Sequence, residues 1–183
     1  MEQFSENDFL ETPKDDKYFT NTMTILILSN QTALHAMHEK AKELGFNAII
    51  LTDRFQGEAK VAGKKLIAQT PPNTILLAGG ETTVKVTKKG KGGRNQELVL
   101  GALENIDENT LIASFDTDGW DNTEFAGAIG DTLTLKKAKE LNMDPKFFLE
   151  ENASFSFFEK VENAIITGRL PSNVSDLMIV MRK

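Results

Sequence analysis

Short apolar runs alternate with helix-like segments along most of the chain, and this alternation restricts the fold more than any other feature. The strand-like runs are residues 24–28, 48–51, 74–78, 110–115 and 177–181, and the helix-like segments are residues 33–44, 58–68, 95–103, 133–141 and 145–151. A further run, Thr82–Thr87, is expected as an edge strand. Strands that alternate with helices form parallel βαβ units, in which apolar strands are buried on both faces. We therefore predict an α/β fold, with a mostly parallel sheet and helices on both faces.

The length and composition suit a single compact domain, since the 183 residues are 40% hydrophobic. Residues 1–20 are polar and lack a period, so we expect a mobile or docking N-terminal arm there and the α/β domain over residues 21–183. The Phe-rich run over residues 147–158 is expected in the core. The chain contains no cysteine, which excludes disulfides. An acidic start without a long apolar run predicts a cytoplasmic protein that does not enter membranes.

The charge is acidic overall but basic in one short stretch. The formal net charge is −6, which disfavours nucleic-acid binding because such proteins present broad basic surfaces. No acid lies between Glu81 and Glu97, and that interval carries Lys85, Lys88, Lys89, Lys91 and Arg94. A local concentration of base in an acidic chain indicates an anionic ligand.

The stretch between Gly79 and Glu97 has the residue types of an anion site. Gly79-Gly80 permits a sharp turn after a strand, Thr82-Thr83 adds hydroxyls, and Gly92-Gly93-Arg94-Asn95 leads into a helix. A helix start offers free N–H groups, and a guanidinium can bind two ligand oxygens at once. The alternative is a solvated hairpin loop followed by a helix cap. Neither the Walker A pattern nor the dinucleotide fingerprint is present, which disfavours a nicotinamide-dependent reductase.

A second candidate site follows the strand over residues 110–115. Asp116, Asp118 and Asp121 lie within six residues, and clustered carboxylates are usually neutralised by a metal or by basic groups. Such carboxylates can hold Mg²⁺ or act as a general base, and the alternative is an ordinary polar turn. Donors for phosphate and acids for Mg²⁺ at neighbouring strand ends are the parts that phosphoryl transfer requires.

Several motifs in order resemble those of one known family. They are Ala78-Gly79-Gly80-Glu81-Thr82-Thr83-Val84, Gly92-Gly93-Arg94-Asn95-Gln96-Glu97-Leu98, Thr117-Asp118-Gly119-Trp120-Asp121, Ala126-Gly127-Ala128 and Ser172-Asn173-Val174-Ser175-Asp176-Leu177. Together they resemble the MOFRL domain, the C-terminal domain of class II glycerate kinases, which are often labelled hydroxypyruvate reductases. The core motifs span residues 74–183, and the stretches Ile25–Asn30 and Leu51–Ala59 resemble the part that precedes this domain in the same enzymes.

The resemblance implies an activity and a set of site residues. Enzymes of this family transfer the γ-phosphoryl group of ATP to the 2-hydroxyl of D-glycerate, using Mg²⁺. Arg94 and Asp118 would then be catalytic, and Asp118 and Asp121 would hold the metal. The residues that would shape the cofactor pocket are Gly79, Gly80, Thr82, Thr83, Gly92, Gly93 and Asn95.

The resemblance also predicts a partner. The family enzyme has a larger N-terminal domain that carries a catalytic lysine, and nothing in this chain matches it. We therefore predict the C-terminal half of a glycerate 2-kinase, acting on a small hydroxy acid together with a separate N-terminal kinase domain or subunit. The alternative is a non-catalytic domain that senses a phosphorylated or carboxylated metabolite. Association into a homo-oligomer stays open.

Overall fold

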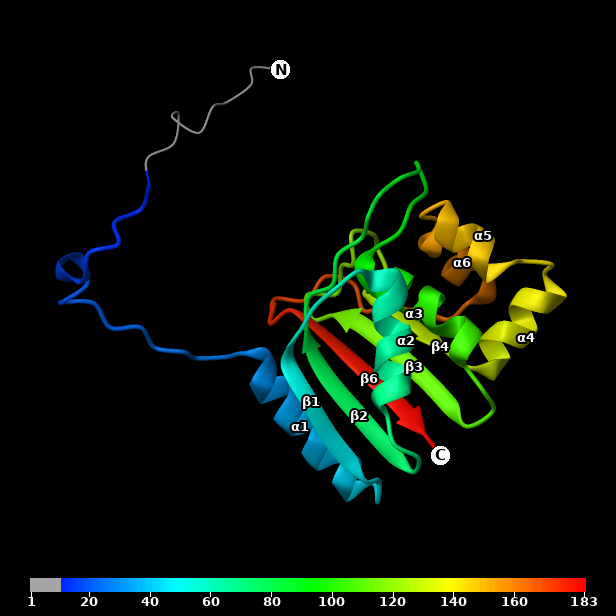
Figure 1. Cartoon of the computed structure of the whole chain (residues 1–183), viewed down its shortest axis with the longest axis horizontal. Coiled ribbons are helices and arrows are strands. Elements are labelled where there is room, and N and C mark those ends of the chain that lie inside the picture. Colours follow the sequence, from blue (N-terminus) through cyan, green and yellow to red (C-terminus); the bar gives the residue numbers. More distant parts are fainter. Residues whose placement is uncertain (1–10) are drawn as a thin grey trace, which may run out of the picture.

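The computed structural model describes residues 11–183 and forms an α/β fold around one sheet, as predicted (Figure 1). The helices are α1 (Asn30–Glu43), α2 (Ala59–Gln69), α3 (Arg94–Ala102), α4 (Thr132–Glu140), α5 (Pro145–Glu150) and α6 (Ser154–Val161), with short 3-10 turns η2 (Asp16–Tyr18) and η3 (Leu103–Asn105). The strands are β1 (Ala48–Phe55), β2 (Thr74–Gly80), β3 (Thr110–Asp116), β4 (Gly127–Gly130), β5 (Ala164–Ile165) and β6 (Asp176–Arg182).

The sheet has six strands in the order β1-β2-β6-β3-β4-β5. Strands β1, β2, β3 and β5 run in one direction, while β4 and β6 run in the other. Among the described strands, β1 and β2 are therefore the one pair of parallel neighbours, and the prediction of a mostly parallel sheet is corrected in this respect. The reason is that β6, the last strand, inserts between β2 and β3 and is antiparallel to both.

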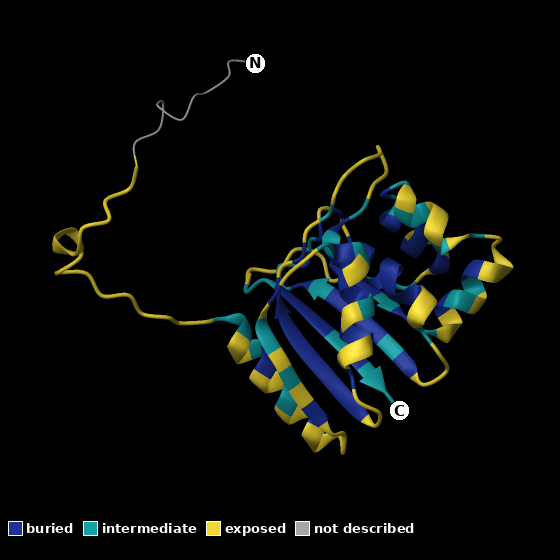
Figure 2. Ribbon diagram, in the orientation of Figure 1, coloured by how far each residue is buried: buried dark blue, intermediate teal, exposed yellow. Residues whose placement is uncertain are grey.

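Helices cover both faces of the sheet, as predicted. Helix α1 packs on β1 and β2, where Leu34 and Ala41, seven residues apart on one helical face, join Ile75 and Leu77 in a buried cluster. On the other face α2 and α3 lie over the centre of the sheet, and α4, α5 and α6 stand beside them (Figures 1 and 2). The larger apolar core lies on this second face and includes Phe157.

Two of the predicted strands do not form. Thr24–Leu28 is extended and exposed and pairs with no described strand, and Thr82–Thr87 makes a single bridge, from Thr83 to Glu58. Strands β4 and β5 and helix α6 were not predicted. The helix α6 contains Phe155 and Phe157, which are buried as expected, whereas Phe147 on α5 is exposed.

The predicted N-terminal arm falls partly outside the described residues. Residues 11–20 are exposed and lead into an extended stretch that reaches the domain at α1 (Figure 2).

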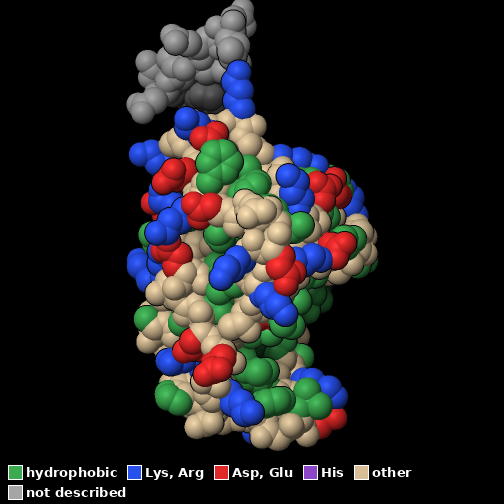
Figure 3. Space-filling view, turned by 90° about the vertical axis from the view of Figure 1, so that its right-hand side faces the viewer, with side chains coloured by type: hydrophobic (Ala, Val, Ile, Leu, Met, Phe, Trp, Pro, Cys, Tyr) green, Lys and Arg blue, Asp and Glu red, His purple; other side chains and the backbone are tan. Residues whose placement is uncertain are grey.

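The face that carries α4 and α5 mixes acidic and basic side chains (Figure 3). Within residues 11–183, no helix has the length and apolarity that a membrane span requires.

Candidate functional site

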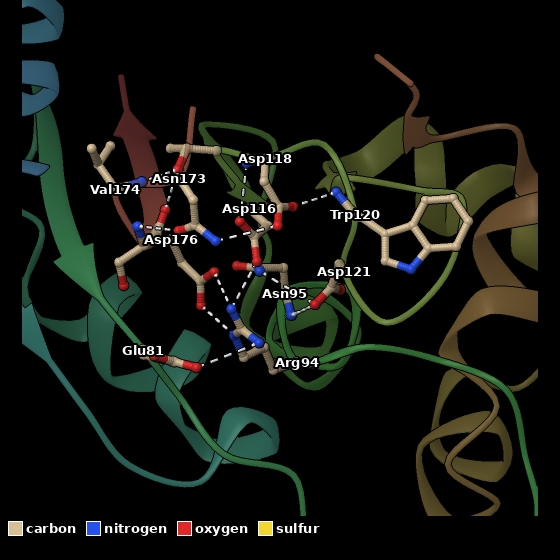
Figure 4. A network of polar contacts seen from close by, with 12 residues as sticks. Glu81, Arg94, Asn95, Asp116, Asp118, Trp120, Asp121, Asn173, Val174 and Asp176 are labelled. Atoms are coloured by element: carbon tan, nitrogen blue, oxygen red, sulfur yellow. Dashed lines mark hydrogen bonds and ion pairs between the residues drawn. The ribbon is translucent and has the colours of Figure 1, made fainter. Parts of the chain in front are cut away.

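The predicted site segments meet at one end of the sheet. The carboxyl ends of β2 and β3 lie on either side of the start of β6, and α3 begins directly above them (Figure 4). This arrangement follows from topology, because strands that run in the same direction deliver their following loops to the same edge. It brings Arg94, from the start of α3, against Asp116 and Asp176.

Arg94 is the centre of the charged network. Its Nε and Nη2 donate to the two carboxylate oxygens of Asp176 at 2.7 and 3.0 Å, and Nη2 also donates to Asp116 at 2.8 Å. The remaining nitrogen, Nη1, lies 3.5 Å from exposed Glu81. The Arg94 side chain is 26% exposed, whereas Asp176 is fully buried. The Nε and Nη2 atoms of the guanidinium are therefore bonded to aspartates, and its Nη1 edge faces outward.

Burial controls the titration of these groups. Burial raises the pKa of Asp116 to about 6, with the charges of Asp176 and Asp118 adding to the effect and Arg94 opposing it. Burial also raises the pKa of Asp176, against the hydrogen bond from Arg94. Burial alone would lower the pKa of Arg94, but Asp176, Glu81 and Asp116 raise it above its usual range. The guanidinium stays charged at any working pH, while the aspartates are costly to ionise.

Asp118 is held in place from two sides. One carboxylate oxygen accepts from the backbone N–H of Trp120 at 2.8 Å, and the other accepts from the side chain of Asn173 at 3.2 Å (Figure 4). The loop before β6 also fastens Thr117, whose hydroxyl donates to the carbonyl of Ser175 and accepts from the N–H of Val174. Asp118 is half-buried, so it presents a fixed carboxylate that solvent and ligands can still reach.

Asp121, predicted to hold the metal, lies at the start of α3. Its two carboxylate oxygens accept the backbone N–H groups of Asn95 and Gln96 at 3.2 and 3.0 Å, so it caps α3 from a distance in sequence. The side chain is fully buried, and burial raises its pKa. Asn95, predicted to line the pocket, is buried beside it and bonds to Asp121 and Ser114. Because these groups fill the start of α3, this helix end is closed to an external anion, and the geometry argues against a metal role for Asp121.

A pocket of about 430 Å³ opens on the outer side of Arg94. Its lining comprises Glu81, Thr82, Thr83, Val84, Val86, Gly92, Gly93, Arg94 and Asn122. The Thr82 hydroxyl is buried there without a hydrogen-bond partner among the described residues. Gly93 closes the back of the pocket, where a Cβ would lie 2.0 Å from the carbonyl oxygen of Asp121. The pocket thus offers an orphan hydroxyl and a guanidinium edge, which suit an oxyanion.

Gly79 and Gly80 lie at the end of β2 and do not line this pocket. Gly80 has a φ of 151° and packs so closely that a Cβ would lie 2.2 Å from the carbonyl oxygen of Phe55. Gly79 lies against Asn30 and Leu34 of α1. Because these glycines lack a side chain, the end of β2 can lie close to β1 and α1. Their role is therefore structural.

The basic loop is anchored to the domain. The side-chain oxygen of Asn152 accepts from the backbone N–H groups of Thr87 and Lys88 at 2.9 and 3.1 Å, and its amide nitrogen donates to buried Glu97. Lys91 lies over the ring of Phe155, 3.6 Å from its centroid. These contacts anchor the lysine-bearing loop over residues 85–91, which we call the strap, to the domain.

The carboxylates near Arg94 offer few ligands for Mg²⁺. Within the described part of the chain, no three His, Asp or Glu side chains group into a metal site. Asp116 and Asp176 bond to Arg94, and Asp121 caps α3, which leaves Asp118 as the accessible carboxylate. Mg²⁺ in phosphoryl-transfer sites often takes one or two carboxylates and completes its shell with phosphate and water. The donor set therefore fits a Mg²⁺ that arrives with a nucleotide.

Sequence reasoning missed the roles of three residues in this site. Asp116 was considered only as a possible metal ligand or general base, Asp176 stood within a quoted motif without a function, and Asn152 was not singled out. The signal for the two aspartates was their position at strand ends beside apolar runs, where an acid needs a cation. No local signal marks Asn152, because its partners lie about 65 positions away in the chain.

Comparison with known proteins identifies the family. The model of the MOFRL family matches residues 74–176, which is more than half of the chain and includes every element of the charged network. The chain belongs to the MOFRL family.

Relatives of this MOFRL chain include glycerate kinases. It is 40% identical to the glycerate 2-kinase of Pyrococcus horikoshii, over 93% of this chain and 41% of the relative, and 38% identical to the D-glycerate 2-kinase of Thermotoga maritima, over 92% and 43%. A protein named as a putative hydroxypyruvate reductase, from Agrobacterium vitis, is 32% identical. The crystal structure of the Thermotoga maritima glycerate kinase superposes with a TM-score of 0.85 at 35% identity, covering 90% of this chain and 43% of that one. The chain thus spans less than half the length of these relatives.

Proposed function

We propose that this MOFRL chain supplies one wall of the active site of a glycerate 2-kinase, which transfers the γ-phosphoryl group of ATP to D-glycerate. The observation that carries the proposal is the pocket beside Arg94, which a fixed guanidinium edge lines together with Thr82, whose buried hydroxyl has no partner among the described residues. The relatives named as glycerate 2-kinases support the same conclusion.

In this proposal Arg94 stabilises negative charge. Asp116 and Asp176 fix the guanidinium plane, so its Nη1 edge can meet an oxyanion of the transferring phosphoryl or the glycerate carboxylate without reorganising. Thr82 donates its free hydroxyl to the same group.

Asp118 is the proposed acidic group of the site. Its carboxylate either accepts the proton of the attacking hydroxyl or contacts a Mg²⁺ carried by the nucleotide, and Asn173 and Trp120 hold it in position for both roles. When bound, Mg²⁺ neutralises charge on the phosphate oxygens. The proposal does not assign a metal to Asp121.

A separate domain or subunit completes the proposed enzyme. The reactants must be held in line for phosphoryl transfer, and the pocket beside Arg94 is an open concavity on one wall. The chain also spans only 41–43% of the glycerate 2-kinases it resembles. We therefore propose that the remaining wall, which binds the second reactant, comes from an N-terminal kinase domain.

Binding of D-glycerate and of MgATP to the chain, measured by isothermal titration calorimetry, tests the proposal. Saturable binding of at least one of them is expected, weakened by Thr82→Val and unchanged by Thr132→Val, an exposed threonine at the start of α4 outside the pocket lining. A folded chain that binds neither compound would overturn it. A coupled assay for ADP with D-glycerate and Mg²⁺ then separates two cases: turnover by the chain alone would remove the need for a partner. Binding without turnover when an N-terminal domain is added would favour a non-catalytic sensor of the metabolite.

A further inference from the structure

The pocket beside Arg94 contains an acid at the point where an anion would bind. Glu81 and Arg94 are the charged side chains of its lining, and Oε1 of Glu81 lies 3.5 Å from Nη1, the outward edge of the guanidinium (Figure 4). The Glu81 side chain is 62% exposed. A carboxylate in this position repels the same oxyanion that the guanidinium edge attracts, so the pocket is poorly suited to an anion that has no other polar group.

The acid is not needed to neutralise Arg94. The guanidinium already donates three hydrogen bonds of 2.7–3.0 Å to the buried Asp116 and Asp176, whereas its contact with Glu81 is longer and open to solvent. Exposed ion pairs of this kind contribute little to stability. The position of Glu81 is therefore better explained by its effect on a ligand than by its effect on the fold.

The main chain fixes Glu81 in the wall of the pocket. The N–H of Glu81 donates to the carbonyl of Phe55 at 2.9 Å, and the N–H of Thr83 donates to the carbonyl of Gly57 at 2.9 Å. These bonds hold Glu81 and its neighbour Thr82 on one wall, and both residues line the pocket. A buried hydroxyl without a partner among the described residues and an exposed carboxylate thus lie at adjacent positions.

A ligand that carries a hydroxyl group near its acidic group satisfies both charged residues. An ionised carboxylate only accepts hydrogen bonds, so Glu81 can bind a ligand group that donates one. With the acidic group of the ligand at Arg94, a hydroxyl on a nearby carbon can donate to Glu81. An acid that lacks this hydroxyl leaves Glu81 unpaired beside a like charge, which disfavours its binding.

We propose that Glu81 determines specificity by accepting a hydrogen bond from the 3-hydroxyl of D-glycerate. The inference rests on the proposed function, because a 2-kinase needs the 2-hydroxyl free to attack the phosphoryl group, which leaves the 3-hydroxyl as the donor. Arg94 and Glu81 then bind opposite ends of one small molecule. D-lactate, which is D-glycerate without the 3-hydroxyl, is the ligand that Glu81 excludes.

Titration of the full chain with D-glycerate and with D-lactate, followed by nuclear magnetic resonance, tests the inference because amide shifts report both affinity and location. The wild type should bind D-glycerate about tenfold more tightly than D-lactate, the worth of one hydrogen bond. Glu81→Ala should reduce this ratio to about one, and Glu81→Gln, which keeps an acceptor oxygen, should retain part of it. Glu108→Ala removes an exposed acid before the first residue of β3, outside the pocket lining, and should leave the ratio unchanged.

The melting temperature separates selection from a structural role. Glu81→Ala should melt at the wild-type temperature, because its ion pair is exposed. A lower melting temperature with both acids weakened equally would show a structural role and overturn the inference. A wild-type chain that binds the two acids equally would also overturn it, while leaving the proposed function intact. If neither acid shifts the amides of the pocket, the inference fails, and the proposed function fails with it only if MgATP does not bind either.

The ribose of ATP is a second source of hydroxyl groups near an anion. Titration of the same variants with MgATP distinguishes the two sources. Glu81→Ala should bind MgATP at least as well as the wild type, since it removes a negative charge from the pocket. A selective loss of MgATP binding, with the ratio of the two acids unchanged, would assign Glu81 to the nucleotide and overturn the inference.

Discussion

Asp116 and Asp176 are direct partners in the antiparallel register of β3 and β6, and the single guanidinium of Arg94 bonds to both. Two buried carboxylates side by side repel each other unless a cation lies between them. The register of β3 and β6 therefore places two carboxylates where a cation must neutralise them, and the start of α3 supplies that cation as Arg94. Fold stability and the proposed site depend on the same three side chains.

Removal of Arg94 should destabilise the chain strongly. Arg94→Ala leaves two buried carboxylates without their cation, so we expect a loss of about 3–5 kcal/mol in the free energy of unfolding, measured with urea. Arg94→Lys should lose less but still destabilise, since one ammonium cannot reproduce the bonds from Nε and Nη2. Lys89→Ala on the exposed strap is the control and should have little effect. An Arg94→Ala variant as stable as the wild type would show that the network contributes nothing.

Stability should fall as the pH rises from about 4 to about 6. The pKa of Asp116 is raised from 3.8 to about 6 in the folded chain, so the folded state binds more protons than the unfolded state across this window. The stabilising contribution is fully present below about pH 4 and is lost as the pH passes about 6. Melting temperatures measured along this range should fall less for Asp116→Asn than for the wild type. Identical slopes for the two proteins would contradict the raised pKa.

Asp121→Ala should act on the helix and leave metal binding unaffected. It removes the acceptor for the N–H groups of Asn95 and Gln96, which should cost about 1–2 kcal/mol of unfolding free energy. Asp121→Asn should cost less, because one side-chain oxygen remains to accept. Affinity for MgATP should stay near the wild-type value in whichever variant remains folded. A selective loss of magnesium-dependent binding without loss of stability would restore the metal role predicted from the sequence.

Thr82→Val should separate binding from stability. The buried hydroxyl has no partner among the described residues, so replacement by a methyl group of similar shape should leave the melting temperature unchanged or raise it. The same change should weaken binding of an anionic ligand in the pocket by about tenfold, the worth of one hydrogen bond. Thr82→Ser should keep most of the affinity. A marked loss of stability in Thr82→Val would show that the hydroxyl has a structural partner.

Magnesium should bind only in company with a nucleotide. The described residues group no three acidic or histidine side chains, and of the four aspartates near Arg94 only Asp118 is free of a bond to Arg94 or to the start of α3. Titration of MgCl₂ into the chain should therefore give no saturable heat in the low millimolar range, whereas Mg²⁺ should strengthen ATP binding. The strengthening should decrease in Asp118→Asn. Tight binding of Mg²⁺ by the chain alone would require a ligand set different from the one described.

The sequence predicted the helices and strands better than it predicted which strands pair in the sheet. Helices α1 to α5 and the central strands were predicted because their apolar spacing is local. The position of β6 in the sheet was not predicted, since its partners in β2 lie about 100 positions earlier. Strand β5 has two residues and β4 is Gly-Ala-Ile-Gly, so neither carries a readable period. Thr24–Leu28 has strand composition but no neighbour to pair with among the described residues.

The residues of the candidate site were proposed from the sequence, and their roles in binding and catalysis stay predictions. Arg94 and Thr82 were predicted to contact a ligand, and the structure places both in one pocket. Asp121 shares its residue type and loop with Asp118, yet it lies under α3 while Asp118 stays accessible. Tertiary packing decides which of two nearby carboxylates caps a helix. The spacing of residues in the sequence does not predict that choice.

The insertion of β6 between β2 and β3 has a consequence for the order in which the protein matures during synthesis. While residues 176–182 are still inside the ribosome, β2 and β3 have no common neighbour, and the acid that grips Arg94 through two bonds is missing. A nascent chain can collapse around its helices by then, but its sheet remains divided into two parts with unpaired edges. Closure of the sheet and assembly of the charged network are therefore one late event, and a chain that stalls before it exposes strand edges to chaperones and proteases.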